Sequence, residues 1–281
     1  MKVRIGIAPP PGDFVTLVDQ AEAAGVDSLW LSEILYGPAV DPFVGMAYAL
    51  ARTTRLKVGT GVAILPGRHP VHVAKQLVSL AALAPKRVLP AFGLSPARPR
   101  EREAFPVPGP RGAVFDESME LLRLLLERDR VTFKGEYFSV ADASIGPARL
   151  DVWLGGSGPA ALARVGRFGD GWLASFLTPA EAGTARRTIA GHASRFGRAI
   201  EEDHYGMSIA VGEPSAELAA AIARRRPDAD PAALVARDWA AARDLIGRYV
   251  DEGLTKFVVR QTHPSPGFVD DFVRELKPLE N

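Results

Sequence analysis

A glycine-rich turn at residues 155–159, Gly-Gly-Ser-Gly-Pro, is the segment whose residue types most suggest ligand chemistry. It follows an apolar stretch and opens a helical one, so free backbone N–H groups and the helix dipole would converge on an anion. A phosphate suits Gly156, Ser157 and Gly158, because glycines allow close backbone approach and the serine adds a hydroxyl donor. The plainer interpretation is a tight turn in which Ser157 caps the helix, the commoner role of one such turn.

A second glycine-containing segment, Gly59-Thr60-Gly61-Val62, ends a strand-like stretch. Glycine weakens a strand unless another group must approach the backbone closely, and a flat cofactor ring is one such group. A β-bulge or a packing constraint would explain the same residues equally well. We predict that Thr60, Gly61 and Val62 contact a ring, with the packing alternative left open.

Two titratable side chains are candidates for proton transfer. Glu33 ends a strand-like stretch and could accept a ring N–H or move a proton, although most such carboxylates cap a loop or pair with an arginine. His69 and His72 could share a helix face as metal ligands, but no third ligand is in view, which favours His69 as a helix N-cap. Arg68 could meet a phosphate or a lid carboxylate. We take Glu33 and His69 as catalytic candidates and predict no metal site.

The elements that must position these residues alternate between strand-like and helix-like stretches, which requires a parallel sheet with its helices outside. The pattern predicts one α/β domain over residues 1–281, a (β/α)8 TIM barrel. In such a barrel, reactive groups come from the carboxyl ends of the strands and the loops that follow. The predicted strands are 3–7, Ser28–Ser32, Leu56–Ala63, Val88–Gly93, Val152–Gly155, Gly171–Ala174, Ser208–Val211 and Lys256–Val259.

Four segments lie outside this simple alternation. Residues Leu94 to Gly112 are rich in proline and arginine without an apolar period, which predicts a lid-like insertion over the barrel mouth after strand four. Residues Val131 to Val140 alternate around Gly135 and predict a small hairpin beside the barrel. Two helices, Ser215–Arg225 and Pro231–Glu252, are expected between the last two strands.

Composition restricts the range of functions. The 34 basic and 33 acidic residues nearly balance, so no field would attract nucleic acid or an anionic membrane. No cysteine occurs, which excludes disulfides and thiolate chemistry and suits a cytoplasmic protein. We expect no export signal and no membrane span, because no long apolar run is present. Walker, HExxH and GxSxG motifs are also missing, which disfavours hydrolases and nucleotide kinases.

Several segments together resemble the bacterial luciferase-like superfamily, which contains FMN-dependent monooxygenases and oxidoreductases dependent on coenzyme F420, a deazaflavin. The resemblance is closest to the F420-dependent branch. It covers roughly the first two thirds of the chain, in the family's order. The segments that carry it are Ala21–Glu33, Leu56–Val62 with Arg68–Pro70 and Ala74–Gln76, and Gly155–Ala160 with Ala163 and Gly169–Trp172.

The resemblance implies roles for the residues already singled out. Ser157 and Gly158 would hold the cofactor phosphate, and Thr60, Gly61 and Val62 would press against its ring. Deazaflavin-dependent members carry a non-prolyl cis peptide at this point, which we place between Gly61 and Val62. Family members also commonly form homodimers.

Two departures from the family pattern concern the catalytic acid and the substrate. Ile34 stands where several members have a histidine directly after the strand-two acid, so that general acid cannot be carried over. Ser95 stands where some sugar-phosphate dehydrogenases of the family have a glutamate, which disfavours a sugar-phosphate substrate. The proton would then come from Glu33, His69 or solvent.

The leading hypothesis is hydride transfer between F420 and a small organic substrate under the predicted lid. One alternative is an FMN-dependent monooxygenase that uses molecular oxygen and flavin reduced by a separate reductase. A second is a non-catalytic flavin-binding protein, and a third is an unrelated barrel, such as an isomerase, that binds a phosphorylated substrate in the glycine turn. Comparing the binding of FMN and deazaflavin separates the first two.

Overall fold

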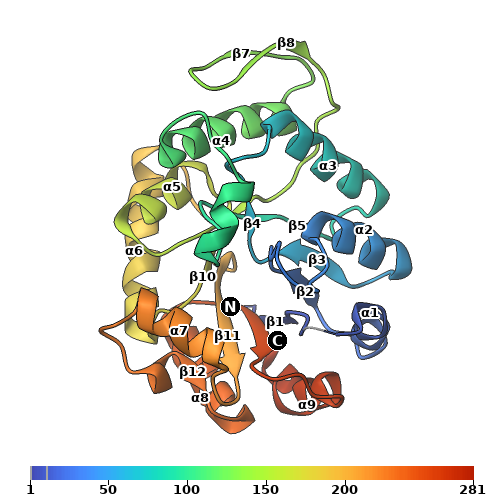
Figure 1. Ribbon diagram of the computed structural model, residues 1–281, viewed down its shortest axis with the longest axis vertical. Coiled ribbons are helices and arrows are strands. Elements are labelled where there is room, and N and C mark those ends of the chain that lie inside the picture. The colour runs from blue at the N-terminus through green and yellow to red at the C-terminus, as the bar shows by residue number, and fades with distance from the viewer. Residues whose placement is uncertain (1, 11) are drawn as a thin grey trace.

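The strands of the protein form a curled parallel sheet with helices around it (Figure 1). The structure is a computed structural model and describes residues 2–10 and 12–281. The parallel strands are β1 (Arg4–Ile7), β2 (Ser28–Leu31), β3 (Lys57–Thr60), β4 (Ala63–Ile64), β5 (Val88–Leu89), β6 (Ala91–Gly93), β9 (Trp153–Gly155), β10 (Gly171–Ala174), β11 (Tyr205–Val211) and β13 (Lys256–Gln261).

Two positions of the sheet are each occupied by a pair of short strands. Residues 61 and 62 separate β3 from β4, and Pro90 separates β5 from β6. Because β3 pairs with β5 and β4 pairs with β6, the hydrogen-bonded order β4-β6-β9-β10-β11-β13-β1-β2-β3-β5 returns to the strand position at which it began. This α/β sheet is consistent with the predicted TIM-barrel-like fold, and each predicted strand overlaps an observed one.

Helices surround the sheet because one face of each is apolar and must be buried against the strands. Side chains of the N-cap residues Asp13, Asp41 and Thr178 accept the first amide hydrogens of α1, α2 and α6. The helices are α1 (Phe14–Ala23), α2 (Pro42–Arg52), α3 (Pro70–Leu83), α4 (Arg111–Glu127), α5 (Pro159–Phe168), α6 (Pro179–Arg195), α7 (Ala216–Arg225), α8 (Trp239–Asp251) and α9 (Phe268–Glu275). No helix in the described part of the chain is both long enough and apolar enough to cross a bilayer.

Two tryptophans fill the space enclosed by the strands. Trp30 and Trp153 meet edge to face with ring centroids 6.0 Å apart, in a cluster that includes Ala8, Leu173 and Val258. Glycines on neighbouring strands make room for these rings. A Cβ on Gly171 would lie 2.3 Å from the Trp153 ring, so the interior below the mouth is solidly packed.

The amino-terminal end of the sheet, which we call the base, is held by ion pairs. Asp27 precedes β2 and binds the ammonium groups of Lys256 and Lys57, the latter at 3.1 Å, with Arg4 at 3.9 Å. These cations lower the pKa of Asp27, although burial alone would raise it. The carboxylate therefore joins the beginnings of several strands.

The predicted hairpin is confirmed, as an antiparallel pair of β7 (Val131–Lys134) and β8 (Ser139–Ala143) at the edge of the molecule (Figure 1). The predicted helix Pro231–Glu252 is wrong in its first part. That part forms a 3-10 turn, η2 (Pro231–Ala233), and a strand, β12 (Val235–Ala236), that pairs with β11. Further 3-10 turns are η1 (Pro99–Ala104), inside the segment 94–112, and η3 (Lys277–Leu279).

Candidate functional site

The link between β3 and β4 forms a small platform at the carboxyl end of the sheet. The peptide bond between Gly61 and Val62 is cis, as the resemblance implied. The Gly61 amide donates to the Leu31 carbonyl at 2.7 Å, and the Ser32 hydroxyl donates to the Gly61 carbonyl at 3.0 Å. The end of β2 thus fixes the platform from one side.

The side chain of Val62 lies between two glycines that end neighbouring strands. A Cβ on Gly93 would lie 2.6 Å from Val62 Cγ2, and a Cβ on Gly155 would lie 3.1 Å from Val62 Cγ1. Val62 also packs on the interior cluster that contains Trp30 and Leu173. The missing side chains at Gly93 and Gly155 are therefore what allows Val62 to occupy the mouth.

Thr60 supports the platform from within the sheet. Its hydroxyl donates to the Ala91 carbonyl at 2.6 Å and accepts the Ala91 amide hydrogen at 2.8 Å. This exchange bridges β3 and β6 beside Pro90, which has no amide hydrogen to offer. Thr60 is fully buried, so its hydroxyl serves the sheet, whereas Gly61 and Val62 are partly exposed at the mouth.

Glu33 is a buried carboxylate with 3% exposure, and both of its oxygens are engaged. Oε2 accepts a hydrogen bond from the Ile64 amide at 2.6 Å and one from Arg68 Nη1 at 3.0 Å. Oε1 accepts a hydrogen bond from Arg68 Nη2. The Glu33 amide donates to the Val62 carbonyl at 3.3 Å. The structure thus shows the alternative in which Glu33 pairs with an arginine, and Glu33 also holds the chain at Val62 and Ile64. A role in proton transfer stays a prediction.

His69 occupies the N-cap of α3, where its Nδ1 accepts the Val71 amide hydrogen at 3.3 Å. Its exposed ring lies 5.3 Å from Phe138 of the hairpin and 5.9 Å from His72. Partial burial and the nearby His72 lower the pKa of His69. The hydrogen bonds of the described residues do not join His69 to Glu33, so the two catalytic candidates are not in direct contact.

The glycine turn leaves β9 and opens α5 as predicted. Gly158 is the N-cap and makes no side-chain capping bond, so the alternative in which Ser157 caps the helix is wrong. Ser157 is exposed, and Gly156 has a φ of 109° that favours glycine. Trp172 Nε1 donates to the Gly156 carbonyl at 2.8 Å and fixes the turn. The amides of Ser157, Gly158 and Ala160 have no hydrogen-bond partner among residues 2–10 and 12–281, which leaves three donors for an anion.

Arg260, near the end of β13, was not singled out by the sequence analysis. Val258 belongs to the interior cluster, and side chains alternate along a strand, so Arg260 faces the inside of the sheet one layer higher, at the mouth. Burial, followed by the nearby positive charge of Arg225, lowers the pKa of Arg260. The sequence shows that Lys256, Val258 and Arg260 share one face of the strand. It does not show whether that face lies inside or outside the sheet.

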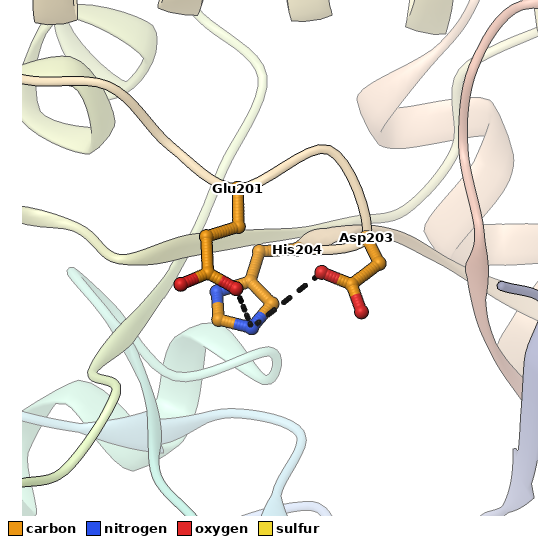
Figure 2. A group of neighbouring side chains, drawn as sticks. All are labelled: Glu201, Asp203 and His204. Atoms are coloured by element: carbon orange, nitrogen blue, oxygen red, sulfur yellow. Dashed lines mark ion pairs between the residues drawn. The ribbon is translucent and has the colours of Figure 1, made fainter. Parts of the chain in front are cut away.

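A separate cluster of polar side chains lies at the base. Figure 2 shows His204 between Glu201 and Asp203 in the loop before β11, with His204 Nε2 3.8 and 4.0 Å from their carboxylates. A cavity of about 530 Å³ adjoins His204 and Asp170. Both carboxylates of the cluster are exposed, and the cluster lies at the opposite end of the strands from the platform and the glycine turn.

The fold and these features define a TIM-barrel-like α/β protein whose exposed glycine turn and platform lie together at the carboxyl ends of the strands. The chain belongs to the luciferase-like monooxygenase family, whose family model matches residues 3–256. This confirms the predicted resemblance and supports an oxidoreductase enzyme.

Curated relatives include proteins named F420-dependent glucose-6-phosphate dehydrogenase. The protein of that name from Kineococcus radiotolerans is 30% identical over 175 residues, which cover 58% of this chain and 52% of the relative. The chain therefore spans about half the length of this relative. The protein from Nocardia farcinica is 27% identical over 314 residues, covering 95% of this chain and 94% of the relative.

Solved structures show the same fold at lower identity. An F420-dependent secondary alcohol dehydrogenase, in complex with an F420–acetone adduct, matches with a TM-score of 0.81 and 20% identity over 100% of both chains. A monooxygenase from Streptomyces bottropensis matches with a TM-score of 0.81 and 22% identity over 98% of this chain and 99% of that one. At these identities the match concerns the fold.

Proposed function

We propose that the protein is an oxidoreductase that transfers a hydride between coenzyme F420 and a small organic substrate. The observation that carries the proposal is the contact between the platform and the glycine turn. Val62 packs against Gly155, the residue from which the turn begins. A single molecule with a flat ring and a phosphate group would therefore reach both parts. The F420-dependent relatives support this cofactor over other molecules of that shape.

Each part of the site has a distinct task in this proposal. The amides near Ser157 and Gly158 and the Ser157 hydroxyl bind the phosphate, while Val62 supports the ring. Glu33 and Arg68 hold the platform in place and so fix the height of the ring above the mouth. When bound, the deazaflavin supplies the hydride chemistry. His69 is the proposed proton donor, because its imidazole is exposed at the N-terminus of α3, which follows β4.

The segment 94–112 is proposed to cover the substrate. Arg98 donates to the Tyr36 carbonyl at 2.6 Å and to the Glu217 carboxylate at 2.7 and 3.0 Å. It thus connects the loop after β2 with α7, which follows β11 on another side of the mouth. A cover at this place would exclude water during hydride transfer.

Cofactor binding tests the proposal. We expect the purified protein to bind F420 tightly and FMN more weakly, measured side by side by absorbance and fluorescence titration. Binding of FMN without measurable binding of F420 would contradict it and favour the second candidate, an FMN-dependent monooxygenase supplied with reduced flavin by a separate reductase. The monooxygenase from Streptomyces bottropensis, which shares the fold, keeps that candidate in view.

A further inference from the structure

The face of β13 that lines the inside of the sheet carries a positive charge at each end. At the base, the Lys256 ammonium lies 5.8 Å from the Trp30 ring centroid and pairs with Asp27. Val258 follows in the interior cluster, and Arg260 comes next on the same face. In the sheet register Arg260 lies opposite Ala210 of β11, above the packed interior. Its guanidinium is thus directed to the mouth.

The two charges differ in their partners. In the part of the chain that the structure describes, Arg260 forms neither a hydrogen bond nor an ion pair through its side chain. The carboxylate of Glu217 lies in its surroundings, but Arg98 already binds both oxygens of that carboxylate. A partly buried guanidinium without a partner is costly, so this arrangement needs a reason outside the packing of the chain.

A second arginine strengthens the positive charge at this point. Arg225, at the end of α7, lies over the Phe176 ring at 5.4 Å, and its Nη2 is 3.5 Å from the Ala97 carbonyl of the segment 94–112. It therefore lies between the loop after β10 and the proposed cover. Its charge acts on Arg260 as a like charge. An anion bound there would relieve both the desolvation of Arg260 and this repulsion.

The position of Arg260 separates it from the proposed cofactor contacts. In the strand order, β13 is the third strand from β9, which carries the glycine turn, and the third from β3, which leads into the platform. A group bound by Arg260 would therefore lie across the mouth from the cofactor phosphate and the ring support. That is the side from which a substrate would face the ring.

We propose that Arg260 binds an oxyanion group of the substrate, a carboxylate or a phosphate, with Arg225 contributing to the attraction. The identification of this group as the substrate's rests on the proposed function. The guanidinium offers a planar fork of donors that matches either oxyanion. An acidic tail of the cofactor has the same chemistry and is the other source of such a group.

The test compares anion binding to the protein, with and without F420, and to three variants. Inorganic phosphate and malonate are titrated by calorimetry at constant ionic strength, with neutral malonamide as the matched uncharged probe. We expect saturable binding of the anions but not of malonamide, a loss on the order of 10- to 100-fold in Arg260→Gln, and partial retention in Arg260→Lys. Arg195→Gln removes the same charge from an exposed site on α6 and should bind anions like the unchanged protein.

Thermal stability and cofactor affinity distinguish a substrate-binding Arg260 from a structural or cofactor-binding one. Arg260→Gln should unfold at the same or a higher temperature, because it removes an unpaired charge; a marked decrease would show a structural arginine and overturn the inference. Equal anion binding by Arg260→Gln and the unchanged protein would also overturn it. Weaker binding of F420 to Arg260→Gln, with no change for a deazaflavin riboside without phosphate and tail, would assign Arg260 to the cofactor instead. Arg260-dependent anion binding in a protein that does not bind deazaflavin would retain the anion site and reject the proposed function.

Discussion

The base and the mouth of the sheet differ in whether their charged and polar groups have partners within the chain. At the base, Asp27 neutralises Lys57 and Lys256, so the charges there serve to join strands. At the mouth, the guanidinium of Arg260 and the amides around Ser157 have no partner within the described residues. The difference shows where the chain uses charge to stabilise itself and where it leaves donors available to a ligand.

The largest effect is expected from removal of the central carboxylate at the base. Asp27→Asn leaves Lys256 buried without a counterion, and we expect the free energy of unfolding to fall by about 3–5 kcal/mol. Chemical denaturation measures this loss. Asp19→Asn, which breaks the exposed pair with Arg52, is the matched control and should cost less than about 1 kcal/mol. Similar losses in both variants would remove the distinction between base and surface.

The base should also make stability depend on pH. The amides of Thr54 and Leu56 donate to Glu22, and despite the opposing effect of burial the pKa of Glu22 falls to about 2. Because the folded pKa lies below the unfolded one, the ionised carboxylate stabilises the protein above about pH 4.5, and this contribution disappears as the pH falls towards 2. Allowing for solvent screening, it is on the order of 2 kcal/mol.

A comparison with Glu22→Gln isolates this contribution. The difference in unfolding free energy between the two proteins should be largest near neutral pH and should close below about pH 3. Urea denaturation across this range measures it. A difference that stays constant with pH would show that the ionised form of Glu22 has no special role in joining α1 to β3.

Substitutions at the mouth should lower the affinity for the cofactor. In Gly93→Ala the new Cβ would meet Val62 Cγ2 at 2.6 Å, so the platform must move. We expect the affinity for F420 to fall about 10- to 100-fold and the stability by about 1–3 kcal/mol. In Gly191→Ala, on α6, the new methyl meets nothing within 4 Å, so affinity should not change and stability should rise by about 0.5–1 kcal/mol. Unchanged affinity in Gly93→Ala would argue against the platform.

The smallest effect is expected at the glycine turn. Ser157→Ala removes one hydroxyl donor but leaves the backbone amides, so F420 should bind about fivefold more weakly, equivalent to about 1 kcal/mol. A deazaflavin riboside without the phosphate should bind both proteins equally. A loss of affinity that is the same for both ligands would place Ser157 near the ring instead of the phosphate.

Much of the fold was predictable because local patterns and tertiary packing agree. Apolar stretches marked the strands of the sheet apart from β12, and the glycine turn lies where the strand-to-helix pattern placed it. Residues 231–238 show where this fails: the alanine-rich run suits a helix, but Asp230 and Asp238 cap separate elements and Val235 pairs with β11. Pairing with a distant strand overrode local helix propensity there.

The candidate site was predictable in position more than in contacts. Gly61 and Val62 were singled out because glycines in a strand require an explanation and because the family resemblance pointed to them. The sequence did not decide whether Glu33 pairs with Arg68. The two residues are 35 positions apart in sequence, and the carboxylate and guanidinium meet only when two strand ends are adjacent. Arg260 was missed because a side chain's face depends on the register of the completed sheet.

The tryptophan pair beneath the platform gives the protein a built-in optical probe. Trp30 and Trp153 are two of its four tryptophans, and Val62 packs on the cluster that contains them. A conjugated ring resting on Val62 would lie within energy-transfer range of both indoles and quench their ultraviolet emission. Occupancy of the mouth can therefore be followed by intrinsic fluorescence in the unlabelled protein, before any substrate has been identified.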